Sequence, residues 1–85
     1  MNYHVSWART AERQLAAVWV AATNRSAVTT ASAWLDEELA MTPLRFGVPI
    51  DSSVHRVGSF DVLGIESEVI EDDKRVIVHG VFAID

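Results

Sequence analysis

The sequence predicts a single α+β domain in which a helical hairpin packs on a small, mostly antiparallel sheet. Three observations predict this class: an alternating segment at residues 3–7, two segments of helical periodicity between residues 10 and 41, and alternating apolar segments from residue 54 onward. The predicted order is one strand, two antiparallel helices and a three-stranded antiparallel meander. We expect residues 1–85 to form one domain, since 85 residues are too few for two.

Residues 3–7 predict a half-buried strand, because Tyr3, Val5 and Trp7 alternate with two polar residues. The next segment predicts a helix with Thr10 as its N-cap. The apolar stripe of this helix consists of Leu15, Val18, Trp19 and Ala22. The cap and turn residues of 23–26 are expected to end it.

Residues 26–41 predict a second helix, which Pro43 ends because proline disfavours helical geometry at the residue before it. Its apolar stripe consists of Val28, Ala31, Leu35 and Leu39. The connection between the two helices is short, so we expect them to lie antiparallel.

The second half of the chain predicts a loop at residues 43–53 and then three strands. The first strand begins near residue 54 and ends at a turn or bulge marked by Gly58, Ser59 and Asp61. The next covers 63–69, and residues 71–74 form a hairpin turn. Both faces of residues 76–84 are largely apolar, which predicts a central strand with residues 3–7 as an additional edge partner.

Composition excludes several classes of protein. The formal net charge is −5, and most carboxylates follow residue 42, so direct binding to a nucleic-acid backbone is disfavoured. The chain has no cysteine, which excludes disulfides and thiolate metal sites. The longest apolar run, residues 15–22, is far shorter than the roughly 20 residues of a membrane span, and no signal-peptide pattern is present. We therefore expect a cytoplasmic protein with no membrane association.

Several segments, taken in order, resemble a known family. "YHVSWARTAERQLAAVW", "NRSAVTTASAWLDEELAMTPLRFG" and "VLGIESEVIEDDKRVIVHGVFAI" are similar in residue pattern and spacing to the RelE/ParE superfamily of type II toxin–antitoxin systems, often called plasmid-stabilisation proteins. The resemblance covers almost the whole chain. It implies a β-αα-βββ fold, a small antitoxin protein as partner, DNA gyrase or the ribosome as cellular target, and no cofactor.

The chain departs from this family at positions that carry RNA cleavage in some members. Ser67 stands where the family has a strand tyrosine, and Val62 stands where it has a proline. Where RNA-cleaving members have basic residues and often a tyrosine or histidine after the last strand, this chain has Ala83, Ile84 and Asp85. The resemblance therefore favours a gyrase-type or degenerate toxin over a nuclease, and leaves open whether the chain is an enzyme.

Arg56 matches the family's arginine ahead of the long hairpin and is the best candidate for a catalytic residue. Arg45, Arg56 and His55 are candidates for binding a phosphate or the target, because a guanidinium can bind two phosphate oxygens. His55 or His79 is a candidate base. A structural alternative is that Arg56 pairs with Glu66 or Glu68 and that Arg45 is a solvated surface charge.

No metal site is expected, because His4, His55 and His79 are scattered along the sequence. His79 is expected to be partly buried.

The resemblance also implies a surface for the antitoxin, for which Leu15, Trp19 and Trp34 are the candidates. The alternative for the tryptophans is core packing. Three hypotheses remain: a toxin-family protein neutralised by an antitoxin and lacking nuclease activity, an active mRNA endonuclease, and a non-toxic scaffold or protein-interaction module.

Overall fold

The computed structural model describes residues 2–84 and contains two helices and one five-stranded sheet. The elements, in chain order, are β1 (His4–Trp7), α1 (Arg9–Ala21), α2 (Arg25–Met41), β2 (Val48–Ser52), β3 (His55–Phe60), β4 (Leu63–Ile70) and β5 (Arg75–Ala83). Within the described residues, neither helix is long and apolar enough to cross a membrane.

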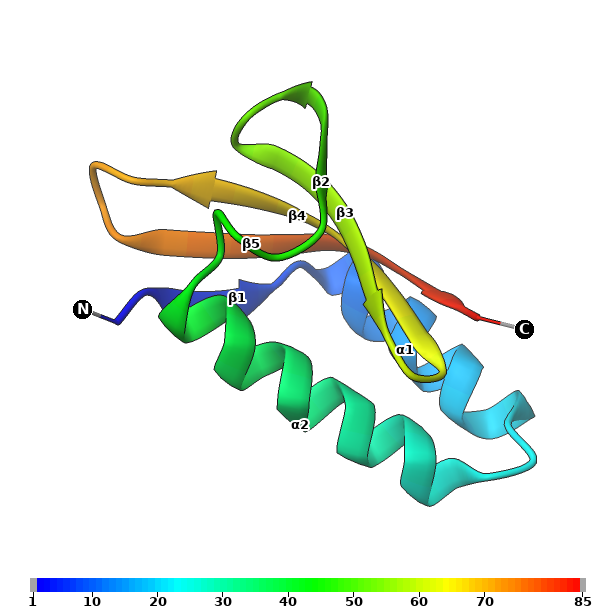
Figure 1. Ribbon diagram of the computed structural model, residues 1–85. Coiled ribbons are helices and arrows are strands. Elements are labelled where there is room, and N and C mark those ends of the chain that lie inside the picture. Colours follow the sequence, from blue (N-terminus) through cyan, green and yellow to red (C-terminus); the bar gives the residue numbers. More distant parts are fainter. Residues whose placement is uncertain (1, 85) are drawn as a thin grey trace.

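The sheet has the strand order β1-β5-β4-β3-β2. Strands β2 to β5 form an antiparallel meander, while β1 pairs with β5 in parallel. Helix α2 runs back alongside α1, and both helices lie on one side of the sheet, so that the other sheet face is open (Figure 1). The α+β class, the helical hairpin and the central position of the last strand are therefore confirmed.

The core lies between the helices and the sheet. All four stripe residues of α2 are buried, as the sequence predicts. They pack with Ala11 of α1 and with apolar side chains of the central strands, which are Leu63, Ile65, Val69, Val76, Val78 and Val81. Val5 and Trp7 of β1 pack against this cluster, as does Tyr3 just before the strand, which confirms the predicted apolar side of this segment.

The helix starts differ from the sequence prediction. Helix α1 begins at Arg9, with Ala8 at the N-cap and no side-chain cap, so the expected capping role of Thr10 is wrong. Helix α2 begins at Arg25, where the Asn24 side chain accepts a hydrogen bond from the amide of Ala27. An asparagine cap satisfies one of the free amides of the first turn.

The expected loop at residues 43–53 contains a strand, and the expected three-stranded meander has four strands. Strand β2 lies at the edge of the sheet, where all of its residues are exposed. A proline such as Pro49 is tolerated there, since an edge position does not need its missing N–H donor. The expected turn at Gly58 and Ser59 also belongs to a strand, β3, and the turn follows at Asp61.

Strand β5 contains an irregularity that changes its apolar pattern. Ser67 pairs with Val78 and Glu66 pairs with Gly80, so His79 is an extra residue with no partner on β4. Such a bulge shifts the alternation by one residue. Val76 and Val78 therefore share the buried face with Val81, instead of with Gly80 and Phe82 as strict alternation predicts.

Candidate functional site

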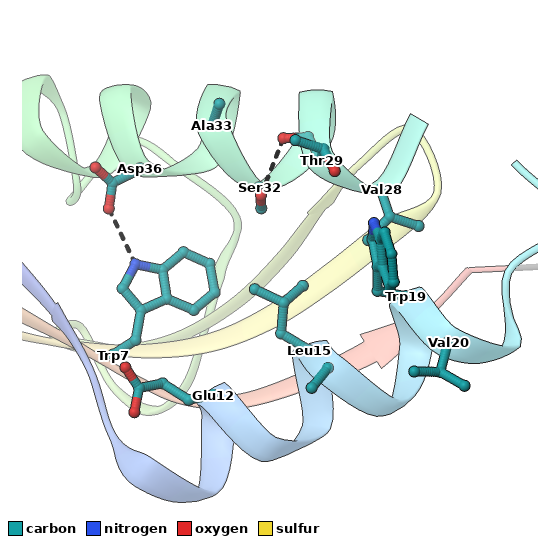
Figure 2. Close-up of a pocket in the computed structure, with 11 residues that line it drawn as sticks. Trp7, Glu12, Leu15, Trp19, Val20, Val28, Thr29, Ser32, Ala33 and Asp36 are labelled. Atoms are coloured by element: carbon teal, nitrogen blue, oxygen red, sulfur yellow. Dashed lines mark hydrogen bonds between the residues drawn. The ribbon is translucent and has the colours of Figure 1, made fainter. Parts of the chain in front are cut away.

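An apolar groove lies between the two helices. It has a volume of about 630 Å³ and is open to solvent. Figure 2 shows Trp7, Leu15 and Trp19 in a row along the groove, with α2 above them. Its lining consists of Trp7, Glu12, Leu15, Ala16, Trp19, Val20, Val28, Thr29, Ser32, Ala33 and Asp36.

Two polar contacts fix the aromatic side chains of this groove. The indole Nε1 of Trp7 donates to Oδ1 of Asp36 over 2.9 Å. At the other end, the guanidinium of Arg25 lies 4.7 Å from the centre of the Trp19 ring and donates to the carbonyls of Trp19 and Val20. A cation at this position also satisfies carbonyls at the C-terminus of α1. Trp19 is thus held in place while 41% of it stays exposed.

The predicted antitoxin surface is only partly brought together. Leu15 and Trp19 line the groove, but Trp34 does not. Trp34 lies on another face of α2, where its ring stacks on Phe60 with 4.0 Å between centroids and 9° between planes. A second contact, tilted by 59°, joins it to Phe46. Trp34 therefore contacts β3 and the turn after α2, but it stays 38% exposed and is not part of the buried core that its structural alternative predicts.

The open face of the sheet carries two histidine–glutamate pairs. His55 Nε2 lies 2.9 Å from Oε2 of Glu66, and His79 Nε2 lies 2.8 Å from Oε1 of Glu68. The two imidazole centroids are 6.4 Å apart. Ser52 and Val54 complete a shallow cavity of about 410 Å³ around these four side chains.

Strand register and the bulge together produce these pairs. His55 lies directly opposite Glu68 on β4, and Glu66 is the next residue on the same face. The extra residue in β5 is His79, and its side chain is exposed. The expectation that His79 is partly buried is therefore wrong, because its side chain lies on the sheet face that the helices leave uncovered (Figure 1).

Arg56 lies on the opposite, helix-covered face. It is 9% exposed and pairs with the buried Ser67. Its guanidinium donates from Nε to the carbonyl of Phe46, from Nη1 to that of Ser53 and from Nη2 to that of Gly47. Pairing with Glu66 or Glu68, the alternative considered above, is wrong, since both carboxylates lie on the open face.

The Arg56 contacts bind the segment before and around β2 to the sheet. A buried guanidinium that donates to three carbonyls has the contacts of a structural residue. The Arg56 side chain and the histidine pairs lie on opposite faces of the sheet. Arg45, another candidate, is exposed in the turn after α2 and lines neither cavity. Within residues 2–84, no three His, Asp or Glu side chains are grouped so that they can hold a metal ion.

Known structures resemble the whole chain. A chain of the toxin–antitoxin complex RelBE2 from Mycobacterium tuberculosis superposes with a TM-score of 0.81 at 16% identity, covering 99% of this chain and 100% of that one. A chain of the chromosomal ParDE toxin–antitoxin system from P. aeruginosa gives a TM-score of 0.70 at 13% identity, covering 98% and 97%. The fold is RelE/ParE-like. No protein-family model matches the sequence, and no curated protein matches it either.

Within this RelE/ParE-like fold, sequence reasoning missed the contribution of Trp7 and Asp36 to the groove. The two residues are 29 positions apart, and no sequence pattern links them. It also missed the proximity of His55 and His79, because that depends on the pairing of β3, β4 and β5. The one sequence feature that pointed to a site on this sheet face was the position of His79 in an otherwise apolar strand.

Proposed function

We propose that this chain is the toxin-fold component of a type II toxin–antitoxin pair, and that a segment of a small antitoxin protein binds in the groove between α1 and α2. The observation that carries this proposal is the open apolar groove with Trp19 fixed at one end. The similar solved chains come from toxin–antitoxin complexes, which supports the same partner class here.

The energetics of the groove favour a protein segment as its occupant. Trp19 and Val20 are 41% and 63% exposed, and exposed apolar surface next to a groove is typical of an interaction site. Tryptophan is the residue type most enriched among residues that dominate binding energy. Because Arg25 already holds the ring, its side-chain entropy is largely lost before the partner arrives, which lowers the cost of association.

A helical segment fits this groove better than an extended one. The backbone groups of α1 and α2 are used within the helices, so they offer no ladder of partners to a strand. A helix satisfies its own backbone and brings an apolar stripe, and the small side chains of Ala16, Ser32 and Ala33 leave room for its close approach.

We further propose that the chain acts through a protein target in the cytoplasm, as a gyrase-type toxin does, or has lost toxicity and kept antitoxin binding. The cavity on the open sheet face is lined by Glu66 and Glu68 and by no lysine or arginine. Cleavage of RNA needs cations that stabilise the charge on the phosphorane. Carboxylates at the same place repel the phosphate instead.

The proposal predicts a small antitoxin protein encoded beside this chain, and co-expression of the two tests it. We expect a stable complex with the unaltered chain and loss of binding on Trp19→Ala. Expression of the chain without its partner arrests growth if the chain is an active toxin and has no effect if toxicity has been lost. A neighbouring protein that binds equally well to the Trp19→Ala variant would contradict the groove as the site. Absence of binding to the unaltered chain would contradict the antitoxin assignment itself.

One observation favours a second function, metal-independent RNA cleavage. Two imidazoles 6.4 Å apart, each next to a carboxylate, are suited to act as base and acid. One would take the proton of the 2′-hydroxyl, and the other would protonate the leaving 5′-oxygen. Incubation of the chain with labelled RNA, alone and with ribosomes, tests this. Cleavage that is lost in both His55→Ala and His79→Ala would establish it, and intact RNA would exclude it.

A further inference from the structure

We propose that Trp7, Glu12 and Asp36 form a recognition site for one cationic side chain, arginine or lysine, of the segment that binds in the groove. This inference rests on the proposed function and adds a charge requirement to it. The three residues come from three different elements, β1, α1 and α2, and all of them line the same groove. In Figure 2 the Asp36 carboxylate points from α2 to the indole of Trp7, and the Glu12 carboxylate of α1 is seen below the Trp7 side chain.

The two carboxylates have oxygen atoms available for a partner. Asp36 uses Oδ1 to accept the hydrogen bond from Trp7, and its Oδ2 has no hydrogen bond or ion pair within residues 2–84. Within the same described range, the Glu12 carboxylate takes part in no ion pair. Both residues are exposed, so a cation reaches them without the cost of burying an unpaired charge.

The indole adds a third attraction. Tryptophan is the aromatic side chain that binds a cation on its ring face most strongly. The hydrogen bond to Asp36 fixes the orientation of Trp7 and increases the electron density of its ring, and both effects favour a cation. A guanidinium or ammonium at this end therefore meets one ring and two carboxylates.

The opposite end of the groove has a different chemistry, so the two ends of the groove favour different side chains of a bound segment. Arg25 covers one face of Trp19, and Val20 lies next to it. From Glu12 to Val20, α1 rises by about 12 Å, which corresponds to roughly two turns of a bound helix. The matching segment has aliphatic side chains toward Trp19 and a basic residue toward Trp7.

Charge also argues against a second copy of this chain as the occupant. The chain has a net charge of −5, so two copies repel each other, and a basic partner is attracted. The proposal therefore commits to a different protein whose binding segment is cationic at one end.

A displayed library of random amphipathic helical peptides tests the site without knowledge of the natural partner. Peptides are selected on the unaltered chain, on the double variant Glu12→Gln/Asp36→Asn and on Trp19→Ala. The Asp36→Asn change keeps a side-chain oxygen that accepts from Trp7, so the double variant removes charge while the groove keeps its shape. Unchanged thermal unfolding of the double variant confirms this.

A second double variant, Asp72→Asn/Asp73→Asn, is the matched control. It removes the same two charges from the exposed turn between β4 and β5. If the site acts locally, binders to the unaltered chain and to this control are enriched in arginine or lysine at one end, and binders to Glu12→Gln/Asp36→Asn are not. For a selected peptide, the affinity falls by roughly tenfold in the groove variant and by less than about twofold in the control.

The outcomes separate the two proposals. Equal basic content in the binders to the unaltered chain and to both double variants, with binding lost on Trp19→Ala, would overturn the charge site and leave groove docking intact. An equal loss of basic residues in both double variants would also overturn it, since overall charge then explains the preference. Peptides that bind Trp19→Ala as well as the unaltered chain would instead overturn the groove as the docking site.

Discussion

The indole N–H of Trp7 donates a 2.9 Å hydrogen bond to Oδ1 of Asp36, and this bond connects β1 to α2 across the groove. No other side-chain hydrogen bond in the described residues joins these two elements. The bond has two consequences, because it stabilises the fold and also fixes one wall of the proposed binding site.

Trp7→Phe removes this bond and keeps most of the apolar surface. We expect a decrease of about 1 kcal/mol in the free energy of unfolding, the typical net value of one hydrogen bond, measured by urea denaturation. Asp36→Asn retains an acceptor and is the control, with an expected change below about 0.5 kcal/mol. Equal destabilisation by the two variants would show that the charge of Asp36 is the important feature.

Arg56→Met replaces the buried guanidinium by an apolar chain of similar length. Three carbonyls lose their donor, so we expect a destabilisation of about 3 kcal/mol. Arg45→Met, which alters an exposed arginine, serves as the comparison and should change stability by less than about 0.5 kcal/mol. If Arg56→Met kept full stability but lost growth arrest or RNA cleavage that the unaltered chain shows, Arg56 would instead have a direct functional role.

Gly47→Ala tests the turn that leads into β2. Gly47 has a φ of +73°, and a Cβ placed there would lie 2.2 Å from the carbonyl oxygen of Val57. Because that neighbour is backbone and cannot move alone, we expect a loss of more than about 2 kcal/mol, measured by thermal unfolding. Gly80→Ala, where the nearest atom is 3.4 Å away, should cost less than about 1 kcal/mol. Similar values for the two variants would contradict this account of the turn.

Trp34→Ala and Trp19→Ala are expected to separate stability from binding. Trp34 stacks on Phe60, so its removal should lower stability by about 2 kcal/mol and leave partner affinity unchanged. Trp19 lines the groove, so its removal should cost about 1 kcal/mol or less in stability and weaken the partner more than tenfold. Denaturation and calorimetric titration give the two quantities. The reverse pattern would place the partner on the Trp34 face.

The main elements of the fold follow from local pattern. The stripe of α2 and the alternation of β1 each have one clear period, and both stripes pack in the core as expected. Strand β2 could not be predicted in this way. Its residues are all exposed and include Pro49, and it is kept in place by Arg56, whose contacts with the surrounding segment are visible only in three dimensions.

The candidate sites depend even more on long-range geometry. The sequence identifies Leu15 and Trp19 as apolar helical residues, but Trp34 has the same character and lies on another face of α2. The histidine pairs depend on a bulge at His79, which alternation does not reveal. The period of a pattern can therefore predict which elements form, while register and bulges decide which side chains meet.

The most direct test of the central claim is a calorimetric titration of the proposed antitoxin, a small protein encoded beside this chain, into the unaltered chain, Trp19→Ala and Trp34→Ala. The proposed groove predicts tight binding to the unaltered chain and to Trp34→Ala, and an affinity at least about tenfold weaker for Trp19→Ala. Equal affinity for all three chains would contradict the groove between α1 and α2 as the antitoxin site.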